Sequence, residues 1–120
     1  MILYRPLGEK EWKLIHESGC KKFPPRLPDQ PIFYPVLDYD YACQIARDWN
    51  SKDPRNGFVG YVTRFRIDAL FASRYPVHTV GAKHHRELWV PAEELAKFND
   101  HIDGYIEVIA EFRLERNLSC

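Results

Sequence analysis

The chain has 120 residues, with 17 basic and 17 acidic side chains, so its formal net charge is zero when His is neutral. This length predicts a single domain, residues 1–120, with a hydrophobic core of its own. Hydrophobic residues make up 45% and charged residues 28%, which is typical of a folded soluble protein and excludes a disordered chain. The zero net charge also removes the simplest argument for binding to nucleic acid or to an anionic membrane.

Cysteine spacing and the lengths of the apolar runs exclude further classes of protein. The chain has three cysteines, Cys20, Cys43 and Cys120, and no C-x-x-C pair, so it lacks the patterns of zinc knuckles and dithiol redox sites. No apolar run of signal-peptide length opens the sequence, and no segment approaches 18 apolar residues. We therefore expect a cytoplasmic protein that has no membrane partner.

Hydrophobic periodicity and turn residues predict short strands that alternate with helices. The expected elements are a strand at 1–5, a helix at 8–18, a Pro-rich segment at 23–35 with a brief edge strand at 32–34, a helix from Asp38 or Asp40 to about Asn50, a strand at 58–67, a helical or irregular piece at 68–74, strands at 75–80 and 87–90, a helix that begins at Pro91, and a strand at 105–114. Short strands with tight connections favour an α+β domain over a doubly wound parallel sheet.

Two details of these elements carry specific expectations. Pro6 is expected to end the opening strand, because proline cannot donate a hydrogen bond within a sheet. The helix at 38–50 has an apolar stripe that is expected to be buried; it consists of Tyr41, Ala42, Ile45, Ala46 and Trp49.

Three groups of residues have the chemistry of a ligand site. Tyr4 and Arg5 end the opening strand, and a guanidinium is a planar donor suited to a phosphate or a ribose; the alternative is an arginine in a surface ion pair. Phe33 and Tyr34 lie in the Pro-stiffened segment, with Tyr41 downstream, and rigidly placed rings are suited to stacking on a flat heterocycle. For these aromatic residues the alternative is core packing.

A third group is the run KHHRE at residues 83–87, which leads into an apolar strand. Glu87 at that strand is suited to stabilising positive charge that develops on a substrate. His84 and His85 are potential metal ligands, but no third ligand lies nearby, so no metal site is predicted. The alternative is a polar loop that runs into a strand. No G-x-S-x-G, P-loop or G-x-G-x-x-G pattern occurs, which argues against hydrolase, NTPase and Rossmann assignments.

Several stretches taken together resemble a known family. They are residues 3–6 (LYRP), 23–28 (FPPRLP), 34–36 (YPV), 41–50 (YACQIARDWN) and 87–95 (ELWVPAEEL). Nearly the whole chain is similar to short bacterial proteins labelled "ADP-ribosylation/crystallin J1". That label joins enzymes that transfer ADP-ribose with enzymes that remove it. The removal enzymes are large, all-helical and hold metals on clustered aspartates, whereas this chain is short and has no Asp-Asp pair, so the resemblance favours transfer.

The resemblance implies a compact ADP-ribosyltransferase-like domain: a split β-sheet with flanking helices, NAD as substrate, no metal, and a macromolecular acceptor of unknown kind. In that family an Arg or His ends an early strand, an aromatic element begins a middle strand, and a Glu lies on a late strand; Arg5, Tyr34 and Glu87 match this order. The implied NAD-binding residues are Tyr4, Arg5, Phe33, Tyr34 and Tyr41, with Arg5 near the ribose or pyrophosphate and Tyr34 and Tyr41 against the nicotinamide.

The same resemblance implies two catalytic residues. Glu87 would bind the 2′-hydroxyl of the nicotinamide ribose and stabilise the oxocarbenium-like centre, and His85 would orient or deprotonate the acceptor. Two other functions remain open. One is a non-catalytic nucleotide- or protein-binding module on the same fold. The other is an RNA 2′-phosphotransferase-like enzyme, which needs several basic residues to converge in one cleft; the candidates are Arg26, Arg64, Arg66 and Lys83.

Overall fold

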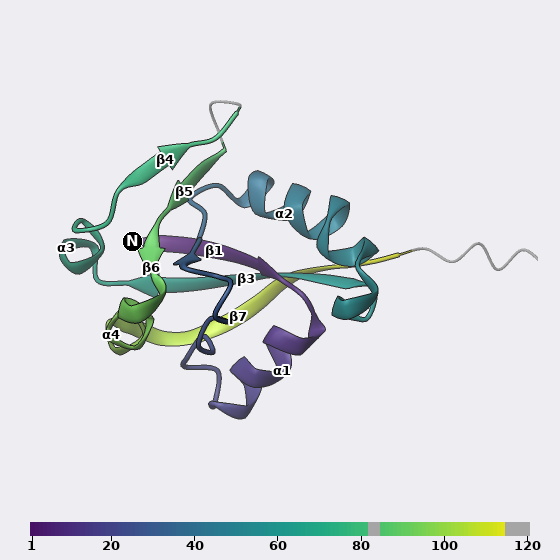
Figure 1. Cartoon of the computed structure of the whole chain (residues 1–120), viewed down its shortest axis with the longest axis horizontal. Helices are drawn as coiled ribbons and strands as arrows, with labels where there is room; N and C mark the ends of the chain where they lie inside the picture. The colour runs from purple at the N-terminus through teal and green to yellow at the C-terminus, as the bar shows by residue number, and fades with distance from the viewer. Residues whose placement is uncertain (82–84, 115–120) are drawn as a thin grey trace, which may run out of the picture.

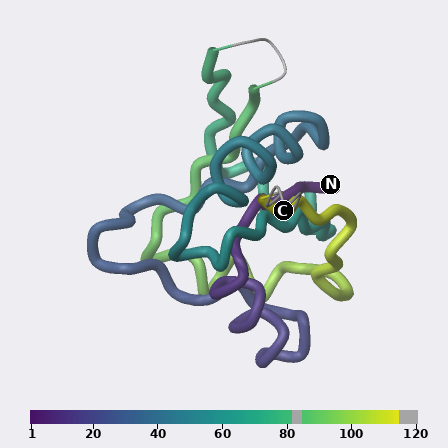
Figure 2. The backbone as a smooth tube through the Cα atoms, turned by 90° about the vertical axis from the view of Figure 1, so that its right-hand side faces the viewer, coloured from purple at the N-terminus to yellow at the C-terminus, as the bar shows by residue number. Residues whose placement is uncertain are grey.

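The computed structural model describes residues 1–81 and 85–114. Its centre is an antiparallel sheet of three strands, β1 (Ile2–Leu7), β3 (Val59–Ile67) and β7 (Ile102–Arg113), with β3 in the middle (Figure 1). Helix α1 (Glu9–Glu17) and helix α2 (Tyr39–Asp48) lie on opposite sides of this sheet in both views (Figures 1 and 2). The expected α+β class is confirmed.

Two short strand pairs extend the architecture. Strand β2 (Ile32–Phe33) pairs with β6 (Val90–Pro91), and β4 (Val77–Thr79) pairs with β5 (Arg86–Leu88) in a hairpin that projects from the rest of the fold (Figures 1 and 2). The remaining elements are short: α3 (Ala69–Ala72), α4 (Leu95–Asp100) and the 3-10 turns η1 (Asn50–Lys52), η2 (Pro54–Asn56) and η3 (Ala92–Glu94).

The residue that follows the Pro-rich segment, Val36, joins the hairpin to the central sheet. Val36 forms a β-bridge with Tyr4 on β1 and another with Glu87 on β5. The Tyr4 amide donates to the Val36 carbonyl at 2.9 Å, and the Val36 amide donates back at 2.7 Å. Two strand spacings therefore separate β1 from β5, which is roughly 10 Å.

Hydrophobic residues from along most of the chain, between Leu3 and Ile106, fill the core on the α1 side of the sheet. Its aromatic centre is a ring cluster in which Phe23 lies 4.9 Å from both Phe33 and Phe65, measured between ring centroids. On the other side, α2 packs against Val36 and Val62. Gly60 on β3 allows this close approach, because a Cβ at this position would collide with the backbone carbonyl of Ala46.

Two local expectations were wrong. Strand β1 continues through Pro6 to Leu7. The Tyr4 amide points away from β3, toward Val36, and the backbone nitrogen of Pro6, two residues later, points the same way. The missing amide hydrogen of Pro6 therefore removes no hydrogen bond to β3. Trp49 is 72% exposed, not buried, because α2 ends at Asp48 and the backbone turns there. No helix in the described part of the chain is long and apolar enough to cross a membrane.

Candidate functional site

The Glu87 carboxylate is held in place by two donors. The Tyr41 hydroxyl donates to Oε2 at 2.8 Å, and the indole Nε1 of Trp89 donates to Oε1 at 3.1 Å. Glu87 itself is half-buried on β5. Because each carboxylate oxygen can accept about two hydrogen bonds, both oxygens keep capacity for a ligand. Glu87 is thus an oriented acceptor, with its position fixed by Tyr41 of α2 and by Trp89, which directly follows β5.

Tyr41 is locked on both its ring and its hydroxyl. Its ring stacks on that of His85, with 4.3 Å between centroids and an interplanar angle of 13°, and the His85 Nε2 lies 3.2 Å from Gln44 Oε1. Burial, the hydrogen bond to Glu87 and the charge of that carboxylate raise the pKa of Tyr41 to about 12 from 10.0. Tyr41 therefore stays protonated and donates to Glu87 over the whole physiological range.

An aromatic corner borders Glu87. Tyr34 and Trp89 meet edge to face at 5.6 Å, and His78 stacks on Trp89 at 3.8 Å. Tyr34 is 38% exposed and Trp89 half-buried, so both rings present accessible surface beside the carboxylate. Such a corner is suited to a flat heterocycle next to a group that interacts with Glu87.

A second charged group lies at the end of β1. Arg5 makes a bidentate ion pair with Glu11 of α1, with Nε to Oε2 and Nη2 to Oε1 both at 3.0 Å. Arg26 of the Pro-rich segment approaches the same Oε1 at 3.3 Å through its Nη2. The Cζ atoms of Arg5 and Arg26 lie 5.0 and 5.2 Å from the Phe33 ring centroid. We call Arg5, Glu11 and Arg26 the arginine–glutamate cluster.

The electrostatics of this cluster follow from its charge balance. Burial by itself would raise the pKa of Glu11, but the charges and hydrogen bonds of Arg5 and Arg26 outweigh burial and hold that pKa below 4.5. Glu11 is therefore ionised at neutral pH, and the three side chains together have a net charge of +1.

One open cavity of about 770 Å³ connects the two charged groups. Its lining includes Arg5, Glu11, Arg26, Tyr34, Glu87 and Trp89. The volume lies within the rough range of 300–1,000 Å³ that small-molecule sites occupy. The β-bridges put Glu87 on the same sheet face as Tyr4 and Val36, so Arg5, the next residue along β1, belongs to the other face. Residues from both faces of the sheet therefore border the cavity, Glu87 from one face and Arg5 from the other.

The predicted site residues divide into those that border the cavity and those that do not. Arg5, Tyr34 and Glu87 border the cavity. Phe33 does not reach it, because its ring is 0% exposed in the core beneath the two arginines, so its expected role against a ligand was wrong. Tyr4 packs on the α2 side against Tyr39 at 5.7 Å and is not among the cavity-lining residues described.

Tyr41 and His85 form a layer next to the described lining of the cavity, since neither contributes to it. The expected stacking of Tyr41 on a ligand ring is contradicted by its geometry, because that ring already stacks on His85 while its hydroxyl binds Glu87. Among the described residues, no group of three or more His, Cys, Asp or Glu is arranged to hold a metal ion, and His84 lies outside these residues.

Sequence reasoning missed Glu11 and Trp89. Trp89 follows Glu87 by two residues, a spacing that puts both side chains on one side of an extended chain, so this partner could have been found. Glu11 had no such signal: its contact with Arg5 depends on how the chain turns at Gly8 between β1 and α1.

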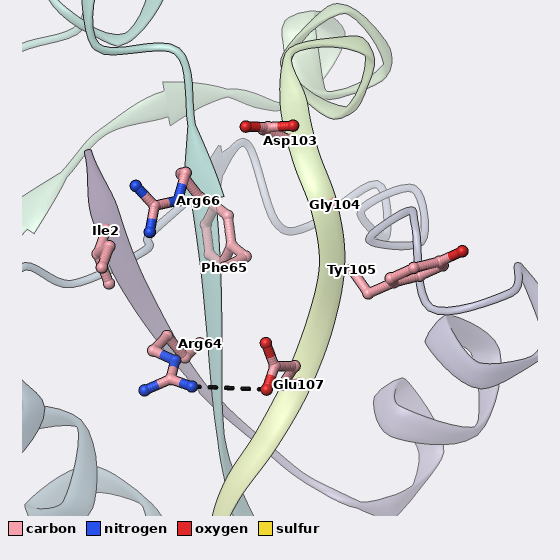
Figure 3. A pocket seen from close by; sticks show the side chains of 8 residues that line it. All are labelled: Ile2, Arg64, Phe65, Arg66, Asp103, Gly104, Tyr105 and Glu107. Carbon is pink, nitrogen blue, oxygen red and sulfur yellow. Dashed lines mark hydrogen bonds and ion pairs between the residues drawn. The ribbon is translucent and has the colours of Figure 1, made fainter.

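The basic residues proposed for an RNA-modifying cleft do not share one. Arg64 and Arg66 line a shallow hollow on the open part of the central sheet, where Arg64 faces Glu107 at 3.5 Å (Figure 3). Arg26 borders the other cavity instead. Lys83 lies outside the described residues.

Comparison of the chain with protein-family models, with curated proteins and with solved structures gave no match.

Proposed function

We propose that this protein is an NAD-dependent ADP-ribosyltransferase that acts on a macromolecular acceptor and releases nicotinamide. The observation that carries the proposal is the Glu87 carboxylate, which is held by two donors, borders a large cavity and adjoins the accessible rings of Tyr34 and Trp89. The resemblance of the sequence to ADP-ribosyltransferases names the same glutamate.

The chemistry needs a fixed negative charge near the ribose. When the bond between C1′ and the nicotinamide nitrogen breaks, the bonding electron pair leaves with nicotinamide and positive charge develops at C1′. Glu87 accepts a hydrogen bond from a ribose hydroxyl and stabilises that charge without reorganising, because Tyr41 and Trp89 already orient it. An acceptor nucleophile then bonds to C1′ and releases its proton to solvent. In this scheme Tyr34 and Trp89 hold the nicotinamide ring.

Tyr41 and His85 are positioning residues in this scheme. Tyr41 acts on the ligand only through Glu87, and His85 supports the Tyr41 ring. That His85 orients or deprotonates the acceptor stays a prediction.

The test is nicotinamide release from NAD by the wild type and by Glu87→Gln. The amide is nearly isosteric, so the fold should survive, while loss of one preorganised charge should reduce turnover by roughly a hundred- to a thousandfold. Glu107→Gln is the matched control, since it removes the same charge from an exposed ion pair with Arg64, in the separate hollow on the central sheet. Equal loss in both variants would contradict the role of Glu87, and no release by the wild type would favour the binding-module alternative.

A further inference from the structure

The arginine–glutamate cluster contains one more cation than its carboxylate needs. Arg5 and Glu11 form a complete pair by themselves, because both carboxylate oxygens already accept a hydrogen bond at 3.0 Å from Arg5. Such bidentate pairs are the strongest form of this contact. Arg26 is therefore surplus to the charge balance of the cluster.

Arg26 is also poorly satisfied. Its contacts within the described residues use one nitrogen, with Nη2 at 3.3 Å from Glu11 Oε1 and 3.4 Å from the Pro24 carbonyl. Both distances exceed the usual 2.7–2.9 Å or so of a charge-assisted bond. Its Nε is buried and has no hydrogen-bond partner in the described part of the chain, although the side chain is only 7% exposed. A buried donor without a partner carries a free-energy cost, which a suitable acceptor would relieve.

The surroundings of Arg26 favour an anion. Burial lowers the pKa of Arg26, and the neighbouring charge of Arg5 lowers it further, while Glu11 only partly compensates. An added negative charge would thus be stabilised here. Lys10 and Arg55 border the same cavity, and Arg55 is already paired with Asp53 at 3.0 Å.

We infer that Arg26 is the anion-recognising side chain of the cavity and binds the diphosphate of a dinucleotide, whereas Arg5 is a positioning residue held by Glu11. This inference rests on the proposed function for the identity of the ligand. It changes the role that the sequence suggested for Arg5, whose donors to Glu11 are already engaged. The planar guanidinium of Arg26 would donate to two phosphate oxygens in place of its two long contacts to Glu11 and the Pro24 carbonyl.

The test is calorimetric titration of the full chain with inorganic pyrophosphate at about 0.15 M salt, followed by competition with NAD. Arg26→Gln should weaken pyrophosphate binding at least about tenfold, because it removes a charged donor from a shielded site. It should leave the fold intact, since the Arg5–Glu11 pair remains. Arg55→Gln, which removes an equal charge from the same cavity at a side chain that is 87% exposed, should weaken binding less than about threefold.

Arg26→Lys provides a second variant, which keeps the charge and loses the planar donor set; its affinity should lie between those of the wild type and Arg26→Gln. Absence of pyrophosphate binding, equal losses in Arg26→Gln and Arg55→Gln, or failure of NAD to displace pyrophosphate would overturn the inference. Nicotinamide release is measured separately. If nicotinamide is released but pyrophosphate binding does not depend on Arg26, this inference alone is wrong. If pyrophosphate binding depends on Arg26 and NAD displaces it, but no nicotinamide is released, the proposed activity alone is wrong.

Discussion

Removing the Tyr41 hydroxyl tests how Glu87 is held. Tyr41→Phe keeps the ring that stacks on His85 and deletes the 2.8 Å hydrogen bond to Glu87 Oε2. A hydrogen bond to a charged group contributes about 1.5–3 kcal/mol, so we expect a loss of about 1.5–2 kcal/mol in the free energy of unfolding. For a domain of this size that corresponds to a fall in Tm of about 6–8 °C. Nicotinamide release should fall about tenfold, because Glu87 keeps its charge and the Trp89 donor.

Tyr75→Phe is the matched control. The Tyr75 hydroxyl donates to Glu94 at 3.0 Å, its ring is 6% exposed against 8% for Tyr41, and burial followed by the Glu94 contact raises its pKa to about 12. The two variants should therefore lose similar stability by thermal or urea unfolding. Only Tyr41→Phe should slow nicotinamide release, because Tyr75 and Glu94 are not among the described residues that line the cavity. Equal slowing in both variants would refute the role of Tyr41.

The same pair of variants predicts a pH dependence. A tyrosine pKa that rises from 10.0 to about 12 on folding means that the folded state binds more protons in this interval. The stability contributed by each tyrosine is thus complete below pH 10 and is lost as the pH rises toward 12. Urea unfolding of the wild type should show this loss, and each Phe variant should show a smaller one. An unchanged pH slope in Tyr41→Phe would contradict the burial and hydrogen bonding described for that hydroxyl.

Three further predictions concern the surroundings of the site. Glu11→Gln should cost about 3 kcal/mol of unfolding free energy at pH 7, because it leaves two guanidiniums without their carboxylate. Since folding lowers the pKa of Glu11, the stability that it contributes is present above pH 4.5 and is lost in acid. The unfolding free energies of wild type and variant in urea should therefore converge toward pH 2, and a constant difference between them would contradict this. Gly60→Ala should cost about 1–3 kcal/mol in the same assay, because the added methyl group meets the Ala46 carbonyl; an unchanged midpoint would count against that packing. Trp89→Phe removes the donor to Glu87 Oε1 and should slow nicotinamide release about tenfold, with a change in stability within about 1.5 kcal/mol; full activity would show that the indole does not orient the carboxylate.

Local patterns predicted the elements well and their contacts poorly. The alternation over residues 58–67 predicted β3, and the apolar stripe before Asn50 predicted α2, because both patterns record burial along one element. The Pro-rich segment that leads to Val36 has no hydrophobic period, so no pattern in the sequence indicates the bridge from Tyr4 through Val36 to Glu87.

For the site residues, too, the sequence predicted the element on which each residue lies but not its contacts. Tyr41 was correctly placed on the apolar stripe, but nothing in that stripe indicates that its hydroxyl meets a carboxylate 46 residues away. Arg5 was expected to be available for a ligand, and its pairing with Glu11 depends on the angle between β1 and α1, which no local pattern fixes. Phe33 and Tyr34 are adjacent aromatic residues; only the register of β2 with β6 decides that one ring enters the core and the other faces the cavity.

The most direct test of the central claim is the fate of NAD labelled in its adenylate half, incubated with the protein and a cell lysate. We predict that label becomes covalently attached to a macromolecule in step with nicotinamide release, and that Glu87→Gln reduces both by roughly a hundred- to a thousandfold while retaining displacement of bound pyrophosphate by NAD. Attachment at the wild-type rate by Glu87→Gln, or intact NAD after prolonged incubation with the wild type, would contradict it.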